Sequence, residues 1–305
     1  MVLKNVGLTG ASGMVGRHVQ ETLKSKNIFC AATSRRPSDS IQENIMWSVW
    51  DLAEWKSPRE LDILFPKVEA ILHVGAIVPN ASVNASEEDF FNANVRSCLS
   101  LGQWALERKI HLVFLSGSTV YAESEKKGIR ESDKKSCGGF GGFYGVTKLL
   151  AEKILKFLEG EGLKLTILRP SSIYGYGLPA GKMVSTFLDK ASEGQCIELT
   201  PPVDDKINLI HAYDVAQALL QVLEKKVYGV FNIAGTFPSS VFEIAQTCVD
   251  VVRKGEVKVL HGDPSRSPTV RFDLCCDAAR DAFEFSPKIN LSQGIKKVWM
   301  EMLHC

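Results

Sequence analysis

The chain has 305 residues, 45% of them hydrophobic, so it is long enough to bury a large core in one domain or two closely packed ones. Its 36 Lys and Arg residues nearly balance 35 Asp and Glu residues, and no basic stripe with interleaved aromatic residues occurs, which argues against nucleic acid as a partner. The longest apolar run is interrupted by Glu69 and His73 and is too short to cross a bilayer, so we expect no membrane partner.

The first predicted elements are a strand over residues 3–8, a glycine-rich turn and a helix. The glycines recur at every third position and the apolar residues after them have helical spacing: Gly7, Gly10, Gly13 and Gly16, then Met14, Val15, Val19 and Leu23. Glycine lets a ligand approach the backbone closely, and the first turn of a helix offers unpaired N–H groups. The stretch predicts a diphosphate site of a dinucleotide at Gly10, Gly13, Met14 and Val15, although alone it would also suit an ordinary strand-to-helix turn.

A second predicted strand, residues 27–33, is followed by Ser34, Arg35 and Arg36. In dinucleotide-binding folds an acidic residue at this point accepts hydrogen bonds from the adenosine ribose, whereas an arginine accommodates a 2′-phosphate. No acidic residue is present here. The sequence therefore favours NADP(H) over NAD(H), with Ser34 and Arg35 as contacts, the alternative being that both arginines belong to a solvated loop.

Two later stretches accompany the glycine turn, Tyr144-Gly-Val-Thr-Lys148 at the start of a predicted helix and Arg169-Pro-Ser-Ser-Ile-Tyr-Gly175. With T-G-x-x-G-x-x-G at the start of the chain, they resemble the extended short-chain dehydrogenase/reductase family, the NAD-dependent epimerase/dehydratase group. The resemblance covers nearly the entire chain. It implies a Rossmann-type, doubly wound parallel sheet over residues 1–170, with 207–234 returning to it, and a smaller C-terminal α/β substrate lobe over 171–206 and 235–305.

The resemblance also implies further cofactor contacts. They lie at positions that match the family's motifs: Asp51, Leu52, Gly75, Ala76, Asn94 and Ser171. The pair at 51–52 matches the adenine-contacting position, residues 73–76 match the turn beneath the cofactor, and Asn94 matches a position beside the nicotinamide half. We expect His73 to be a buried structural histidine.

The helical spacing of Tyr144 and Lys148 places the phenol and the ammonium on one face, pointing into the same cleft. An ammonium favours the phenolate, so we expect it to lower the pKa of Tyr144 from its ordinary value of about 10. Tyr144 is predicted to be a catalytic acid/base. Lys148 is predicted to lower the pKa of Tyr144 and to bind the cofactor ribose. Taken alone, the spacing would also fit a pair on a surface helix.

The third catalytic group departs from the family pattern. A Ser or Thr four residues before the tyrosine of the family's S-S-x-x-V-Y-G segment bonds the reacting oxygen, and counting back from Tyr121 gives Gly117. The hydroxyls of Ser118 and Thr119 stand next to it. We predict Ser118 as the catalytic hydroxyl and both residues as substrate contacts.

The predicted substrate pocket departs from the family as well. Ser172 stands where many members have an asparagine that contacts a sugar nucleotide, and Ile207 where relatives have an arginine for the substrate diphosphate. Arg266 or Arg271 could supply that charge, and Ser172 and Arg266 are predicted substrate contacts. Asp214 is expected to be the N-cap of the helix that follows.

A tyrosine beside a nicotinamide supports hydride transfer at a ketone or carbinol. Dehydratases of the family need an acidic pair where this chain has Ser118 and Thr119, so dehydration is disfavoured. We predict an NADPH-dependent reductase of a 4-keto sugar nucleotide or a similar carbonyl compound. An NAD-dependent nucleotide-sugar 4-epimerase and a non-catalytic dinucleotide-binding sensor are the alternatives. Relatives commonly dimerise through the helices that carry Asn94 and Tyr144, which implies a homodimer.

Eight cysteines occur without C-x-x-C spacing, and only Cys275 and Cys276 adjoin. The pattern indicates reduced thiols in a cytoplasmic protein and no metal site.

Overall fold

Near-continuous apolar runs form a parallel sheet whose two faces are both covered by helices. The strands lie in the spatial order β10-β6-β5-β4-β1-β2-β3 and every neighbouring pair is parallel. They are β1 (Asn5–Thr9), β2 (Phe29–Ser34), β3 (Ile45–Val49), β4 (Ala70–His73), β5 (His111–Leu115), β6 (Leu165–Pro170) and β10 (Gly229–Ile233). This computed structural model describes residues 3–36, 44–79, 85–178, 181–261 and 267–304. The predicted doubly wound parallel sheet is confirmed.

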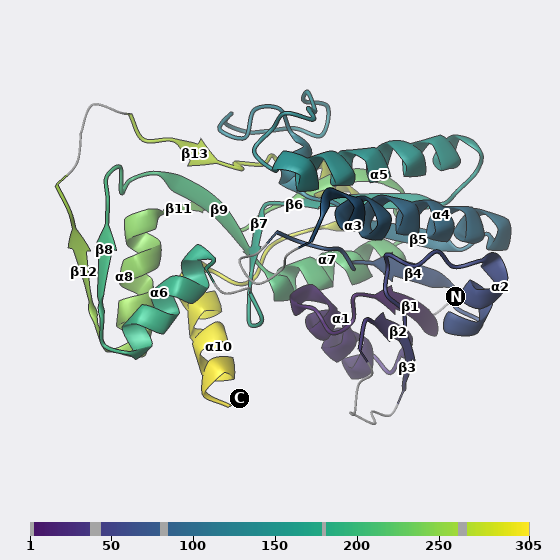
Figure 1. Ribbon diagram of the computed structural model, residues 1–305, viewed down its shortest axis with the longest axis horizontal. Coiled ribbons are helices and arrows are strands. Elements are labelled where there is room, and N and C mark those ends of the chain that lie inside the picture. Colours follow the sequence, from purple (N-terminus) through teal and green to yellow (C-terminus); the bar gives the residue numbers. More distant parts are fainter. Residues whose placement is uncertain (1–2, 37–43, 80–84, 179–180, 262–266, 305) are drawn as a thin grey trace.

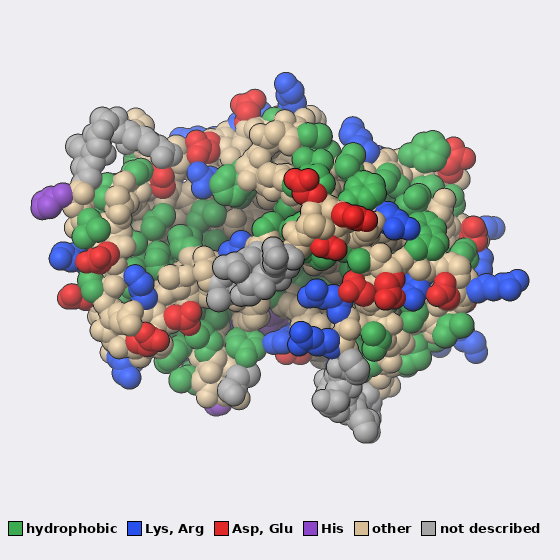
Figure 2. Space-filling view, in the orientation of Figure 1, with side chains coloured by type: hydrophobic (Ala, Val, Ile, Leu, Met, Phe, Trp, Pro, Cys, Tyr) green, Lys and Arg blue, Asp and Glu red, His purple; other side chains and the backbone are tan. Residues whose placement is uncertain are grey.

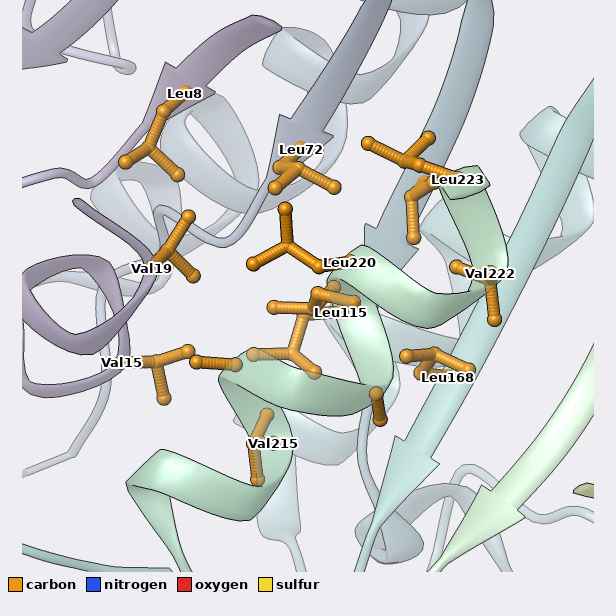
Figure 3. Close-up of a cluster of buried hydrophobic side chains, with 14 of the residues drawn as sticks. Leu8, Val15, Val19, Leu72, Leu115, Leu168, Val215, Leu220, Val222 and Leu223 are labelled. Carbon is orange, nitrogen blue, oxygen red and sulfur yellow. The ribbon is translucent and has the colours of Figure 1, made fainter. Parts of the chain in front are cut away.

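Helices pack on the two faces of the sheet, with α1 and α7 on one face and α4 and α5 on the other (Figure 1). The helices of this lobe are α1 (Met14–Ser25), α2 (Pro58–Leu64), α3 (Glu87–Phe91), α4 (Ser97–Arg108), α5 (Gly142–Gly160), α7 (Ala212–Glu224) and α9 (Asp277–Phe283). A π-helical turn, η1 (Asn92–Arg96), joins α3 to α4. In Figure 3, Leu8, Leu72 and Leu115 from the sheet lie in one cluster with Val19 of α1 and Leu220 of α7. The alternation of strand side chains thus fills a separate core on each face.

The C-terminal lobe has two small sheets and three helices (Figure 1). Its elements are β7 (Ser172–Tyr174), α6 (Met183–Ser192), β8 (Cys196–Leu199), β9 (Lys206–His211), β11 (Pro238–Ser240), α8 (Val241–Val252), β12 (Glu256–Val259), β13 (Val270–Arg271) and α10 (Leu291–Leu303). Strand β9 pairs with β7, β11 and β13, and β8 pairs with β12. Capping boxes at Ser240 and Asn290 begin α8 and α10, whose apolar faces meet around Leu188 of α6.

The chain re-enters the first lobe at α7. Within the 207–234 segment, β9 belongs to the second sheet, while α7 packs on α1 and β10 extends the main sheet. The prediction that Asp214 caps α7 is wrong, because the N-cap is His211, whose side chain accepts a hydrogen bond from the Tyr213 amide. Asp214 lies in the first turn and its carboxylate accepts bonds from the amides of Lys288 and Ile289, both at 3.0 Å. It therefore fastens the segment before α10 to the first lobe.

On the face shown in Figure 2, acidic and basic side chains intermingle over the surface of the first lobe. None of the helices in the described ranges combines the length and apolar character needed to cross a membrane.

Candidate active site

Residues 9–16, called here the phosphate turn, join β1 to α1. Gly10 has a positive φ of +66°, and a Cβ on it would lie 2.5 Å from the Cα and 2.7 Å from the nitrogen of Gly75. A Cβ on Gly16 would lie 2.2 Å from the Gly10 carbonyl oxygen. The Ala11 amide donates to the Thr33 carbonyl at 3.1 Å, which fixes the turn to the end of β2. Glycine is therefore required at positions 10 and 16 for the turn to pack this tightly.

The first turn of α1 is open to an anion. Its N-cap is Gly13, which offers no side-chain acceptor to the N–H groups of Met14, Val15 and Gly16. The first N–H groups of a helix have no partner within the helix, and the helix dipole favours negative charge there. The phosphate turn therefore fits the diphosphate of a dinucleotide, because side chains are absent at Gly10, Gly13 and Gly16 and the N-cap offers no side-chain acceptor to the first N–H groups of α1.

The loop after β4 lies against the phosphate turn. Thr9 Oγ1 is 2.7 Å from His73 Nδ1 and accepts a hydrogen bond from the Gly75 amide at 3.2 Å. A Cβ on Gly75 would come within 2.7 Å of Leu52 Cδ1, so the predicted contacts Leu52 and Gly75 are neighbours, and Ala76 follows. Burial lowers the pKa of His73 to about 3, so this histidine is neutral and structural, as expected.

Asn94 lies in η1 and holds the loop after β4 in place. The Asn94 side-chain oxygen accepts a hydrogen bond from the backbone N–H of Ile77 at 2.8 Å, and the side-chain nitrogen donates one to the Ile77 carbonyl at 3.0 Å. The same side chain donates to Thr147 Oγ1 at 3.2 Å, on the turn of α5 between Tyr144 and Lys148. Asn94 therefore connects the loop under the predicted cofactor to the helix that carries the predicted acid. The partner Thr147 was not anticipated from the sequence, although it lies inside the Tyr144–Lys148 motif.

At the end of β2, the Ser34 hydroxyl donates to the Arg36 carbonyl, and the side chains of Arg35 and Arg36 are exposed. After β3, Asp51 accepts from the Ala53 amide at 3.0 Å. Both segments follow strands of the main sheet at its carboxyl edge, the edge at which the phosphate turn lies. The predicted adenine-side contacts are thus brought to one edge of the sheet.

Gly117, Ser118, Thr119, Tyr144 and Lys148 form what we call the catalytic corner, between the end of β5 and the first turns of α5. Lys148 is 3% exposed, and its Nζ donates to the Leu115 carbonyl at 2.9 Å. The same nitrogen lies 5.8 Å from the centre of the Tyr144 ring. The predicted sharing of one helix face by the phenol and the ammonium is confirmed.

The predicted direction of the Tyr144 pKa is wrong. Burial raises the pKa of Tyr144 to about 12, and burial likewise lowers the pKa of Lys148 to about 8, opposed by Cys98 and the Glu152 carboxylate. Loss of hydration is the largest cause of both shifts, because removal from water disfavours the charged form of each group. Tyr144 is thus a protonated phenol and a potential proton donor over the whole neutral range.

The two candidate hydroxyls follow β5. Ser118 begins the 3-10 turn η2 (Ser118–Val120) and is 3% exposed. Thr119 packs against the first turn of α5, since a Cβ on Gly141 would lie 2.7 Å from Thr119 Cβ. The Thr119 hydroxyl oxygen is buried and has no hydrogen-bond partner among the residues that the structure describes.

On the substrate side, Ser171 donates to Asn208 Oδ1 at 3.0 Å, and the same oxygen accepts from the Gly235 amide at 2.8 Å. Ser172 begins β7. Arg271 of β13 pairs in register with Ile207 of β9, which places its backbone beside the position that lacks the family's arginine. Arg266, the predicted substrate contact, lies outside the described residues.

A buried polar network missed by the sequence reasoning lies beneath the catalytic corner. Arg169 Nε donates to Glu152 Oε1 at 2.9 Å, and Arg169 Nη1 donates to the Tyr121 hydroxyl and the Glu131 carbonyl, both at 3.1 Å. Tyr121 in turn donates to Asn232 Oδ1 at 2.6 Å. An arginine inside an apolar strand requires a buried partner, and that requirement was the available signal. The network ties α5, β6, β10 and the loop before α5 together.

Within the described ranges, no three His, Cys, Asp or Glu side chains are grouped so that they could hold a metal ion. The seven cysteines of these ranges are free thiols.

Comparison with known proteins adds a family match and a curated relative. The model of the NAD dependent epimerase/dehydratase family matches residues 6–234. A dTDP-4-dehydro-6-deoxy-D-allose reductase from a Streptomyces species is 25% identical over an alignment covering 93% of this chain and 92% of the relative.

Solved structures share the fold. UDP-N-acetylglucosamine 4-epimerase from Bacillus cereus superposes with a TM-score of 0.83 at 21% identity, covering 100% of this chain and 98% of that one. A dTDP-glucose 4,6-dehydratase from Bacillus anthracis, solved in complex with NAD, gives a TM-score of 0.80 at 19% identity, with coverage of 98% and 97%.

Proposed function

The chain belongs to the NAD dependent epimerase/dehydratase family, and we propose that it reduces the ketone of a 4-keto nucleotide sugar or a similar carbonyl compound, with Tyr144 as the proton donor. The observation that carries the proposal is the pair of Tyr144, which is partly buried, and Lys148, which is buried, beside residues 118 and 119, whose side chains are hydroxyls and not carboxylates. Elimination of water needs both an acid and a base at the substrate carbons, whereas reduction of a ketone needs one proton donor, here Tyr144. A reductase aligned over 93% of the chain supports the same choice.

The residues that would hold the dinucleotide are those of the phosphate turn, the 34–35 and 51–52 segments, the loop held by Asn94, and Lys148. When bound, the reduced nicotinamide supplies the hydride. Tyr144 donates its phenolic proton to the carbonyl oxygen as the carbonyl π bond breaks, so the substrate gains one C–H and one O–H bond. Lys148 stabilises the resulting phenolate, which regains a proton from solvent before the next turnover.

We infer that NADP(H) is the preferred form within this NAD dependent family. No acidic side chain ends β2, Ser34 lies within reach of the backbone of residue 36, and Arg35 is exposed and positively charged. A guanidinium can form an ion pair and hydrogen bonds with the 2′-phosphate of NADP. NAD has only an uncharged hydroxyl at that position, so it gains no such ion pair.

The test is an assay of the purified protein with NADPH and a dTDP-4-keto-6-deoxyhexose. We expect stoichiometric loss of NADPH and one new carbinol at C4 of the sugar by NMR. The competing activity, 4-epimerisation, would interconvert UDP-glucose and UDP-galactose with no net consumption of a cofactor that stays bound. Epimerisation without ketone reduction would overturn the proposal.

We also propose a homodimer through the helices that carry Asn94 and Tyr144, which are η1, continuous with α4, and α5. Leu150 and Phe157 of α5 are 36% and 69% exposed, which is unusual for large apolar side chains on the helix that carries the acid. Light scattering during size-exclusion chromatography should give twice the chain mass, and Phe157→Glu should give the monomer. A wild-type monomer at micromolar concentration would contradict the dimer.

A further inference from the structure

Thr119 carries a buried hydroxyl that the described fold does not use. Its Oγ1 is one of four buried side-chain nitrogen or oxygen atoms without a partner in the described ranges, and it is the one that lies in the catalytic corner. Leaving a buried hydroxyl unpaired is unfavourable, since the group has lost its hydrogen bonds to water. An unpaired hydroxyl at a candidate active site indicates that its hydrogen-bond partner belongs to a bound ligand.

Next to this buried hydroxyl, the side-chain position of Gly117 is unfilled and has room for one Cβ-sized group. Gly117 has extended backbone angles, φ −175° and ψ 160°, which any residue adopts. A Cβ built on Gly117 would find Thr119 Oγ1 as its nearest neighbour at 3.5 Å and the Thr119 amide nitrogen at 3.9 Å, both ordinary contact distances. The absent side chain of Gly117 therefore leaves room beside the Thr119 hydroxyl.

Two glycines of the adjacent helix hold Thr119 in position. A Cβ on Gly141 would lie 2.7 Å from Thr119 Cβ, and a Cβ on Gly145 would lie 2.9 Å from the Thr119 carbonyl oxygen. Gly145 directly follows Tyr144, so Thr119 packs against the turn of α5 that carries the proton donor. The hydroxyl is thus held beside that turn by backbone packing and not by a hydrogen bond of its own.

We propose that the Thr119 hydroxyl donates a hydrogen bond to the carbonyl oxygen that Tyr144 protonates, with the substrate entering the space that Gly117 leaves open. The inference rests on the proposed ketone reduction and assigns to Thr119 the role predicted for Ser118. As hydride adds to the carbonyl carbon, negative charge grows on the oxygen, and a second fixed O–H donor stabilises it. Thr119 is then a catalytic residue whose hydroxyl acquires its partner only with substrate bound.

The test is Thr119→Val, which exchanges the hydroxyl for a methyl group of similar size. We expect kcat/KM for the ketone to fall about 100-fold, dinucleotide affinity to stay unchanged, and the Tm to be equal to or higher than that of the wild type, because no hydrogen bond of the fold is lost. Thr247→Val is the matched control. The Thr247 hydroxyl donates to the Glu243 carbonyl on α8 at 2.6 Å, so its loss should lower the Tm slightly and leave kcat/KM unchanged.

A rescue variant tests whether a hydroxyl beside position 119 is sufficient for the proposed role. In Gly117→Ser combined with Thr119→Val, the new hydroxyl enters the open space, and we expect at least a tenfold recovery of kcat/KM over Thr119→Val alone. Thr119→Val with wild-type turnover, or with a clearly lower Tm, would overturn the inference. So would a loss of turnover in Ser118→Ala that Thr119→Val does not share. In each of these cases the wild type still reduces the ketone, so the proposed function stands, whereas a wild type that reduces no ketone ends both.

Discussion

The phosphate turn and the catalytic corner lie at the same edge of the sheet but depend on different parts of the chain. In the phosphate turn the donors are backbone N–H groups, and what the sequence must provide is the absence of side chains at Gly10 and Gly16. In the catalytic corner the proposed chemistry belongs to side chains, those of Thr119, Tyr144 and Lys148. One site is therefore specified by backbone geometry and the other by buried functional groups.

The two sites also differ in how they relate to stability. The phosphate turn packs tightly, so a substitution that blocks ligand binding there also strains the fold. In the catalytic corner, Tyr144 has a raised pKa, Lys148 has a lowered one, and Thr119 has no partner, so the folded state gains little from these polar groups. Apolar replacements there should remove activity without weakening the fold, which is the usual trade-off at an active site.

The largest expected effect is that of Gly10→Ala. Its Cβ would meet the backbone of Gly75 at 2.5 Å in a left-handed conformation, so we expect a loss of at least about 3 kcal/mol in the free energy of unfolding and no measurable dinucleotide binding. Gly128→Ala is the matched control, because Gly128 has a φ of +61° with nothing within 4 Å of its Cβ position. It should cost about 1 kcal/mol and leave binding intact. Urea unfolding measures the stability of each variant, and a fluorescence titration measures its dinucleotide binding. An equal loss of stability in Gly10→Ala and Gly128→Ala would show that steric contact with Gly75 is unimportant.

Next in size is Tyr144→Phe, which removes the proposed proton donor and keeps the ring. We expect kcat to fall about 100- to 10,000-fold, with dinucleotide affinity and the unfolding midpoint within error of the wild type. Stopped-flow measurement of ketone reduction and an equilibrium titration on the same samples check this. Unchanged turnover would remove Tyr144 from the reaction.

Lys148 gives a pH-dependent prediction. Burial lowers the pKa of Lys148 from 10.5 to about 8. Below pH 8 the ammonium is therefore charged in both the folded and the unfolded protein, and the full free-energy cost of burying that charge destabilises the fold. Between pH 8 and 10.5 the native state has lost the proton and the unfolded state has not, so that cost declines as the pH rises. Lys148→Met should therefore be inactive, yet more stable than the wild type at pH 7 by between about 1 and 3 kcal/mol, allowing for the lost bond to Leu115.

The advantage of Lys148→Met should shrink towards pH 10.5, and kcat/KM of the wild type should decline above about pH 8 as the ammonium is lost. Denaturant unfolding at several pH values and a pH–rate profile provide the two measurements. A variant less stable than the wild type at pH 7 would show that Lys148 supports the fold.

Much of this comparison could be predicted from the sequence, because both sites rest on local patterns. The glycine spacing located the turn and the start of α1, and the spacing of Tyr144 and Lys148 placed them on one helix. The predicted family, and with it the prediction of an enzyme, is confirmed by the family match and by enzyme relatives.

The remainder depends on contacts between distant parts of the chain. Asn94 meets Thr147 across 53 positions, and Asp214 meets Lys288 across 74, and no local periodicity encodes such pairs. The pKa of Tyr144 was predicted in the wrong direction for the same reason: spacing shows that an ammonium is near, but only the packed structure shows how much water both groups have lost.

The smallest expected effect concerns Arg35, which is exposed and lies outside both sites. If it contacts a 2′-phosphate, Arg35→Ala should raise the Kd for NADPH about tenfold and leave the Kd for NADH unchanged, and the difference should diminish at high salt because exposed charges are screened. Arg59→Ala on α2 removes an exposed arginine elsewhere and should change neither constant. Parallel fluorescence titrations at low and high ionic strength measure this. A wild type that binds NADH as tightly as NADPH would contradict the inferred preference while leaving the phosphate turn and the catalytic corner unaffected, because neither depends on the charge that follows β2.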